Sequence, residues 1–181
     1  GLGTSTARYG SFSVGVLAVV NALGDVLDGS GKIIAGARDE SGSFLDTGAL
    51  LREQGVNGEF GRVEESPRPG TNTTLVVVAT DAPLSAPDLE RVARLASTGL
   101  ARRISPVNTP FDGDIVFSLS TAPGPEQLSP GRVMSLGVVA RDLVEAAVER
   151  AVFLGARDGE GRDGPPGDDP PGDQGARERG G

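Results

Sequence analysis

An uninterrupted apolar run near the middle of the chain, Leu75-Val76-Val77-Val78-Ala79, most limits what this sequence can fold into. A run this short and this rich in β-branched residues is typical of a buried strand rather than a helix. The turn signal Thr80-Asp81-Ala82-Pro83 ends it, and Ser66-Pro67-Arg68-Pro69-Gly70, which suits neither a helix nor a central strand, precedes it. Asn72 and Thr73 therefore lie where a connecting segment meets a rigid strand, a place where a backbone bond can be strained or cut.

Two ordinary interpretations of Asn72-Thr73-Thr74 come first. The tripeptide matches the acceptor pattern for N-glycosylation, although no signal peptide is visible. It also suits the start of a strand, because threonine favours pleated, half-buried positions. Taken alone, these residues favour the strand start; the rest of the chain changes that weighting.

Length and charge bound the class of protein. The 181 residues suffice for one domain with a real core. The formal net charge of -8 argues against nucleic acid and anionic membrane surfaces as partners, since both attract clustered Lys and Arg. No apolar stretch is long enough to span a bilayer, and nothing in the sequence directs export, so we expect a cytoplasmic protein. Without cysteine there is no disulfide and no thiolate nucleophile.

The absence of histidine restricts the chemistry further. It removes the usual general base near neutral pH and the commonest transition-metal ligand, and it excludes a Ser-His-Asp triad within this chain. A hydrolase of this composition would need a carboxylate, a lysine, or a freed terminal amine beside its own threonine hydroxyl. The single lysine, Lys32, follows Gly31 and is typical of a turn leading into a strand. The amine and the carboxylates remain.

Ahead of the central run, the sequence predicts further strands. Residues 12–20 form a nearly continuous apolar segment, which indicates a strand buried on both faces. Asn21, which ends it, is either a turn residue or a side-chain amide donor directed into a site. Residues 32–37 indicate a short strand, and the Gly-, Ser- and Thr-rich residues 1–6 indicate a loop.

Apolar spacing predicts the helices. A short helix over residues 49–53 is capped by Asp46-Thr47, and helical spacing covers residues 87–102 and the segment from Gly131 to about Leu154-Gly155. The apolar stripes of these helices are core. Residues 54–70 indicate an exposed connector. Residues 156–181 carry no large apolar side chain, so we expect a disordered tail without activity.

Asp112 and Asp114 flank Gly113 immediately before a predicted strand over residues 115–119. This pattern allows three interpretations. It is a plain turn, or a metal site, although the calcium-loop spacing is absent, or a pair of carboxylates that orients a nucleophile. Close carboxylates raise one another's pKa, so one of the two could stay protonated and act as a donor.

Considered together, these motifs resemble the DmpA-type aminopeptidase family (L-aminopeptidase/D-esterase), and most of all its branch of NylC-like 6-aminohexanoate oligomer (nylon-oligomer) hydrolases. The resemblance rests on Asn72-Thr73-Thr74, on Thr80-Asp81-Ala82-Pro83, on Thr109-Pro110-Phe111-Asp112-Gly113-Asp114, on Gly1-Leu2-Gly3-Thr4 and on Val19-Val20-Asn21. It runs from about residue 1 to Ala151 in the family's order. It implies an α/β fold of the DmpA/ornithine-acetyltransferase type, an αββα sandwich with an N-terminal nucleophile. Because family members carry about half of their large subunit upstream, it also implies an N-terminally incomplete chain.

The resemblance implies the site as well. The precursor would cut itself between Asn72 and Thr73, and Thr73 would become the nucleophile. Asp112 and Asp114 would position that nucleophile and assist the cut, and Asn21 would donate its amide near the oxyanion. Residues 1–72 would be the C-terminal part of the large subunit, 73–155 the small subunit and 156–181 the tail. The resemblance also implies a homo-oligomer of processed heterodimers, and we expect no cofactor and no metal.

A physical argument stands beside this resemblance. A threonine hydroxyl is a poor nucleophile unless a base contacts it, and an α-amine with a pKa of about 7.7–8.0 is a far better base near neutrality than lysine. We therefore expect hydrolysis of short peptides or amino-acid oligoamides through an acyl-enzyme at Thr73. Two alternatives stay open: an acyltransferase of the ornithine-acetyltransferase type, and a non-catalytic assembly subunit.

Overall fold

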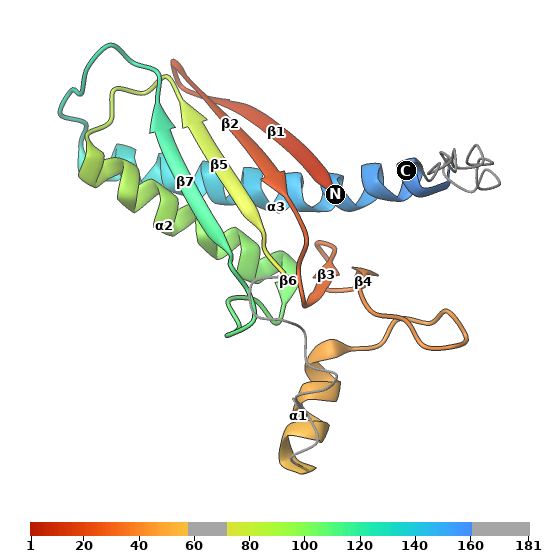
Figure 1. Ribbon diagram of the computed structural model, residues 1–181. Coiled ribbons are helices and arrows are strands. Elements are labelled where there is room, and N and C mark those ends of the chain that lie inside the picture. Colours follow the sequence, from red (N-terminus) through yellow and green to blue (C-terminus); the bar gives the residue numbers. More distant parts are fainter. Residues whose placement is uncertain (58–71, 161–181) are drawn as a thin grey trace, which may run out of the picture.

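The computed structural model describes residues 1–57 and 72–160. Four strands precede the first helix, and strands and helices are mixed along the rest of the described chain (Figure 1). In order they are β1 (Leu2–Tyr9), β2 (Phe12–Val19), β3 (Asp25–Leu27), β4 (Ile33–Ala35), α1 (Thr47–Asn57), β5 (Leu75–Thr80), α2 (Ala86–Arg103), β6 (Ile104–Ser105), β7 (Ile115–Ser120) and α3 (Pro130–Glu160).

The main sheet has four strands in the order β1-β2-β5-β7. β2 pairs antiparallel with both β1 and β5, whereas β5 and β7 run parallel. A parallel pair needs a crossover connection, and α2 supplies most of it. α2 and α3 both lie against the same face of this sheet (Figure 1). A smaller antiparallel sheet, β4-β3-β6, lies beyond the end of β2.

The core fills the space between the main sheet and the two helices. Every second residue of β2 and β5 points inward, and the apolar stripes of α2 and α3 meet them, as their spacing predicts. The fully buried side chains include Val14, Val16, Ala18, Val76, Val78, Val92, Ala96, Leu100, Leu136, Ala140, Val144, Ala147 and Val148.

The opposite face of the main sheet is exposed within the described residues, which corrects the expectation that residues 12–20 are buried on both faces. Leu17 and Val19 are 40% and 38% exposed. Large apolar residues of the other three strands lie on the same outer face: Leu2, Leu75, Ile115, Phe117 and Leu119. An apolar run cannot show from sequence alone which of its faces is covered, and here the helices cover only one.

Most predicted elements are confirmed, with two exceptions at the ends. Residues 1–6 are not a loop, because β1 begins at Leu2 and pairs along its whole length with β2. The last helix does not end near residue 155; α3 continues to Glu160, so residues 156–160 are helical rather than part of a disordered tail. Adding a residue to an existing helix costs far less than starting one. Residues 161–181 lie outside the described residues.

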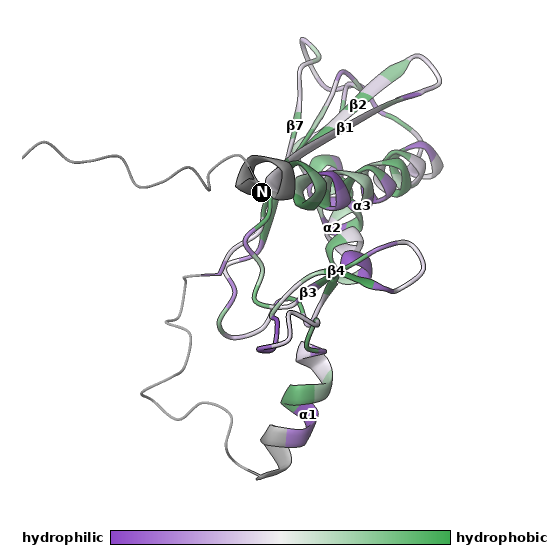
Figure 2. Ribbon diagram, turned by 90° about the vertical axis from the view of Figure 1, so that its right-hand side faces the viewer, coloured by the Kyte–Doolittle hydropathy of each residue, from purple (hydrophilic) through white to green (hydrophobic). Residues whose placement is uncertain are grey.

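α1 projects away from the sheet and its two helices (Figures 1 and 2). Asp46 caps it, accepting a hydrogen bond from the Ala49 N–H at 2.8 Å. The buried Asp25 carboxylate of β3 accepts from both the N–H and the hydroxyl of Thr47, at 2.7 and 2.9 Å, and so fixes the start of α1 to the small sheet. Residues 54–57 are helical, not connector, and residues 58–70 fall in the undescribed gap. Among the described helices, none combines the length and the apolar character needed to cross a membrane.

Candidate active site

The peptide group between Asn72 and Thr73 is held from two sides. It lies just ahead of β5, between the end of β2 and the segment that leads into β7. The Thr73 N–H donates to the main-chain oxygen of Asn21 at 2.8 Å, and the Asn72 carbonyl accepts from the Gly113 N–H at 2.9 Å. A parallel bridge also pairs Asn72 with Asp112. Both polar groups of this one peptide are therefore fixed by neighbouring strands.

The Thr73 hydroxyl lies against the carbonyl that precedes it. Its Oγ1 donates to the Asn72 carbonyl oxygen at 2.7 Å, and the residue is only half-buried. Gly113 also lies close to this hydroxyl, since a Cβ added to Gly113 would come within 2.8 Å of Oγ1. The hydroxyl is thus close both to its own peptide and to Gly113.

Asp114 positions the residue after Thr73. Its Oδ1 accepts from the N–H of Thr74 at 2.7 Å, and its Oδ2 accepts from the N–H of Asn108 at 3.3 Å. Thr74 is completely buried, so this carboxylate supplies the partner that the buried N–H needs. Asn108 takes the left-handed φ of 55° that asparagine tolerates better than most residues.

Asp112 has one oxygen in use and one without a partner. Its Oδ2 accepts from the Thr109 N–H at 2.9 Å, whereas its buried Oδ1 makes no hydrogen bond within the described residues. The buried Oγ1 of Thr74 also lacks a partner there. Buried polar atoms of this kind are uncommon and need an explanation. Both belong to residues next to, or paired with, the Asn72–Thr73 peptide.

The structure brings the four residues named from sequence to one place, but not always as expected. Thr73, Asp112 and Asp114 meet where β5 and β7 begin, and Asn21 joins them from the end of β2. The recorded contact of Asn21 with Thr73 uses its main-chain oxygen, not the side-chain amide considered above. Gly113, which also contacts this site, was not among the residues predicted from sequence. Its place between the two acids was the signal available.

A cavity of about 480 Å³ borders Asn21 at the end of β2. Its walls are mainly apolar and come from β2, the small sheet and the C-terminal half of α3, with Val20, Ala22, Ile34 and Val152 among them. Arg38 stands at this cavity and stacks on Phe44, its guanidinium carbon 3.8 Å from the ring centre. Arg38 forms no ion pair within the described part of the chain.

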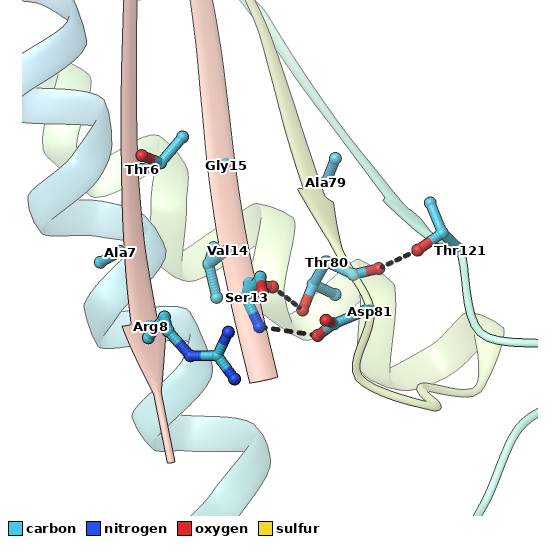
Figure 3. A pocket seen from close by; sticks show the side chains of 10 residues that line it. All are labelled: Thr6, Ala7, Arg8, Ser13, Val14, Gly15, Ala79, Thr80, Asp81 and Thr121. Carbon is cyan, nitrogen blue, oxygen red and sulfur yellow. Dashed lines mark hydrogen bonds between the residues drawn. The ribbon is translucent and has the colours of Figure 1, made fainter. Parts of the chain in front are cut away.

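A second hollow, of about 680 Å³, lies at the other end of the main sheet (Figure 3). Gly15 and Ala79 lie side by side in its lining. Asp81 accepts from the Ser13 N–H at 2.7 Å, and the Thr80 hydroxyl donates to the Ser13 carbonyl at 2.8 Å, which ties the end of β5 to β2. The length of β5, about 20 Å at roughly 3.3 Å per residue, separates this hollow from Thr73. The Thr80-Asp81-Ala82-Pro83 motif therefore closes the strand and takes no part in the candidate site.

Comparison with known proteins shows which family the chain is similar to. The sequence model of Peptidase family S58 matches residues 1–165. An uncharacterized aminopeptidase from Mycobacterium leprae is 38% identical over 165 residues, covering 84% of this chain and 44% of the relative. A 6-aminohexanoate-oligomer endohydrolase from Paenarthrobacter ureafaciens is 27% identical over 159 residues, covering 83% of this chain and 44% of the relative. The chain thus spans about half the length of the curated relatives it matches.

The fold is similar to that of a solved aminopeptidase structure. The L-aminopeptidase D-Ala-esterase/amidase from Ochrobactrum anthropi superposes with a TM-score of 0.54 at 26% identity. The match covers 83% of this chain and 39% of that enzyme, which is described as a prototype for the serine aminopeptidases and a variant of the Ntn-hydrolase fold. This agreement confirms the expected α/β fold of the N-terminal-nucleophile type. In the present chain, the residue whose N–H and hydroxyl are both held by hydrogen bonds at the candidate site is a threonine, Thr73.

Proposed function

Because this chain belongs to peptidase family S58, we propose that it is the nucleophile-bearing part of a self-processing amide hydrolase, cut between Asn72 and Thr73. The observation that carries the proposal is the fixed peptide at this position. Its N–H and carbonyl are each bonded to a neighbouring segment, and the Thr73 hydroxyl lies 2.7 Å from the carbonyl oxygen. A nucleophile held next to the peptide group that it attacks does not have to be brought there and oriented, and this lowers the entropic part of the activation free energy.

The cut would create the base that the chain otherwise lacks. Hydrolysis of the Asn72–Thr73 bond frees the α-amine of Thr73, whose ordinary pKa of about 7.7–8.0 lets it accept a proton near neutral pH. This amine belongs to the same residue as the hydroxyl, so it would serve as the general base when Thr73 attacks a substrate amide. The acyl-enzyme formed in this way would then transfer its acyl group to water.

The two carboxylates would act through position. Asp114 holds the Thr74 N–H at 2.7 Å, and this bond would keep the new N-terminal residue in line after the cut. Asp112, with one buried oxygen unpartnered, would take a hydrogen bond from a group that arrives during the reaction, such as the protonated amine. Asn21 would contribute through its main-chain oxygen to the amine and through its amide near the oxyanion.

The substrates we propose are short peptides with a free amino end, or linear oligoamides of amino acids. Names of the relatives support this class, since they include aminopeptidases and 6-aminohexanoate-oligomer endohydrolases. The apolar cavity beside Asn21 would accept part of such a substrate. We also propose that the processed pieces 1–72 and 73–181 form a heterodimer that assembles into a homo-oligomer in the cytoplasm.

The intact mass of the purified chain tests the cut. We expect fragments 1–72 and 73–181 in the parent and in Thr98→Ala, and a single mass in Thr73→Ala. Thr98 is the matched control, because its hydroxyl is exposed and donates to the Leu95 carbonyl of its own helix. A Thr73→Ala chain that is still cut at residue 72 would refute the proposal.

Activity of the cut protein separates the alternatives. Release of amino acids from short peptides supports the hydrolase, provided that transfer of the acyl group to added amines is no faster than its hydrolysis. Transfer to the added amine that outruns hydrolysis supports the acyltransferase. Cut protein that forms no acyl-enzyme with activated esters supports the assembly subunit.

A further inference from the structure

The carbonyl of Asn72 receives two hydrogen bonds, and one of them comes from a residue that no motif assigns a role. The Thr73 hydroxyl donates at 2.7 Å and the Gly113 N–H donates at 2.9 Å. In the self-cleavage proposed above, this is the carbonyl that Thr73 attacks. Its oxygen becomes negatively charged in the tetrahedral intermediate, so a main-chain N–H already directed at it is placed to stabilise that charge.

We propose that Gly113 is a catalytic residue of self-cleavage, acting through its main-chain N–H on the Asn72 oxyanion; this inference rests on the proposed function. In the step concerned, a bond forms between Thr73 Oγ1 and the Asn72 carbonyl carbon, and the bond from that carbon to the Thr73 nitrogen breaks. The hydroxyl proton ends on the leaving nitrogen, giving an ester and a free amine. Water then hydrolyses the ester, so the balance needs no other reactant.

Gly113 has a steric reason to be glycine as well. Its φ is not positive, so the backbone there does not require glycine. A Cβ at this position would instead lie 2.8 Å from Thr73 Oγ1 and 3.6 Å from Thr73 Cγ2, closer to the hydroxyl than such contacts occur. The missing side chain leaves room for the attacking hydroxyl. One residue thus supplies the donor and the space.

The contacts on either side hold the Gly113 N–H in place. Asp112 pairs with Asn72 across the bridge, and its N–H donates to the Thr109 carbonyl at 3.0 Å. On the other side, the Ile115 N–H donates to the Thr74 carbonyl at 3.0 Å, which continues the parallel pairing of β5 with β7. A donor fixed before the reaction needs no reorganisation when the charge develops.

The test removes the N–H without changing the shape of the residue. Glycolic acid in place of Gly113, introduced into the full chain by nonsense suppression, replaces the amide N–H by an ester oxygen. The rate of appearance of fragment 73–181 should fall roughly 10²–10³-fold, the usual loss for one oxyanion donor. The matched control is the same replacement at Gly124, where an added Cβ would meet nothing within 4 Å and which follows the end of β7 that lies away from the site. It should process at the parent rate.

A second pair of variants tests the steric part. Gly113→Ala should slow processing strongly when residue 73 is threonine. In the Thr73→Ser background the same Ala should cost at least tenfold less, because a serine hydroxyl can leave the crowded rotamer while threonine is held by its methyl group. General misfolding from Gly113→Ala would instead slow both backgrounds equally.

The outcomes separate this inference from the proposed function. Parent-rate processing of the Gly113 ester overturns the inference and leaves self-cleavage standing. Equal effects of Gly113→Ala in both backgrounds overturn the steric part. A parent chain that stays at one mass, like Thr73→Ala, overturns the proposed function and this inference with it.

Discussion

Removing the Asp114 carboxylate should destabilise the fold by an amount set by one buried hydrogen bond. Its Oδ1 accepts from the Thr74 N–H at 2.7 Å, and Thr74 is 0% exposed, so water cannot replace a lost partner. Asp114→Ala leaves a buried N–H unpaired and loses a charge-assisted bond, which together cost about 2–3 kcal/mol. Asp114→Asn keeps an oxygen at the same place and loses only the charge, about 1 kcal/mol.

Urea unfolding measures this prediction, with every variant in the Thr73→Ala background so that cleavage cannot change the population. The midpoint should fall in the order parent, Asp114→Asn, Asp114→Ala at an unchanged slope. Asp142→Ala is the control, because its side chain is 58% exposed and its ion pair with Arg141 should contribute at most about 0.5 kcal/mol. If Asp114→Ala costs no more than Asp142→Ala, the carboxylate does not hold Thr74 as argued.

Three other predictions follow from contacts away from the site. Gly99→Ala should lower stability by about 1–3 kcal/mol despite alanine's better helix propensity, because its Cβ would lie 2.6 Å from a main-chain oxygen of α3; Gly131→Ala, with open space around it, should not lower it in the same thermal melts. Glu145→Gln should cost about 3 kcal/mol, since the 8% exposed Glu145 side chain faces three arginines, and a urea midpoint that does not move would contradict this. The Ser85 hydroxyl, and then Arg91, lower the pKa of Asp88 below its ordinary 3.8, so its stabilisation is present above about pH 4 and is lost as the pH falls through the lowered value. Asp88→Asn should therefore flatten the decline of melting temperature in acid, and an unchanged acid limb would argue against it.

The helices and the inner strands were predictable because their apolar spacing reports burial directly. In the structure Ser85 caps the start of α2, its hydroxyl accepting a hydrogen bond from the Asp88 N–H at 3.3 Å. The family resemblance, not a topological rule, implied that Thr73 would meet Asp112 and Asp114. The structure shows how they meet, because the parallel pairing of β5 with β7 brings the starting residues of both strands to the same edge of the sheet. These parts of the fold and site depend on local pattern and on simple topology.

β1 could not be predicted from sequence because its small residues are required by packing against α3, not by strand propensity. Gly3 and Ser5 face α3, and a Cβ on Gly3 would overlap the carbonyl oxygen of Ala147. The close approach of the helix selects glycine and serine there, and the sequence pattern of such a strand is hard to tell from that of a loop. The exposed outer face was missed for a related reason, since an apolar residue shows that burial is favourable but not what provides it.

Gly113 and the main-chain oxygen of Asn21 could not be assigned from sequence, because main-chain donors and acceptors are the same at every position. What distinguishes them is where the strands place them. A glycine between two acids is common in turns, and only the distance to Thr73 Oγ1 separates this one from an ordinary turn residue.

The position of β5 between β2 and β7 has a consequence for the proposed cut. New chain ends usually fray, but this one would lie in the interior of a sheet, with neighbours on both sides. The ladder from Val14↔Thr80 to Val19↔Leu75 would change from an intrachain contact into the seam between two polypeptides. α3 would belong to one piece while packing on β1 of the other. The pieces could then separate only by global unfolding, so the nicked protein should melt as one cooperative unit.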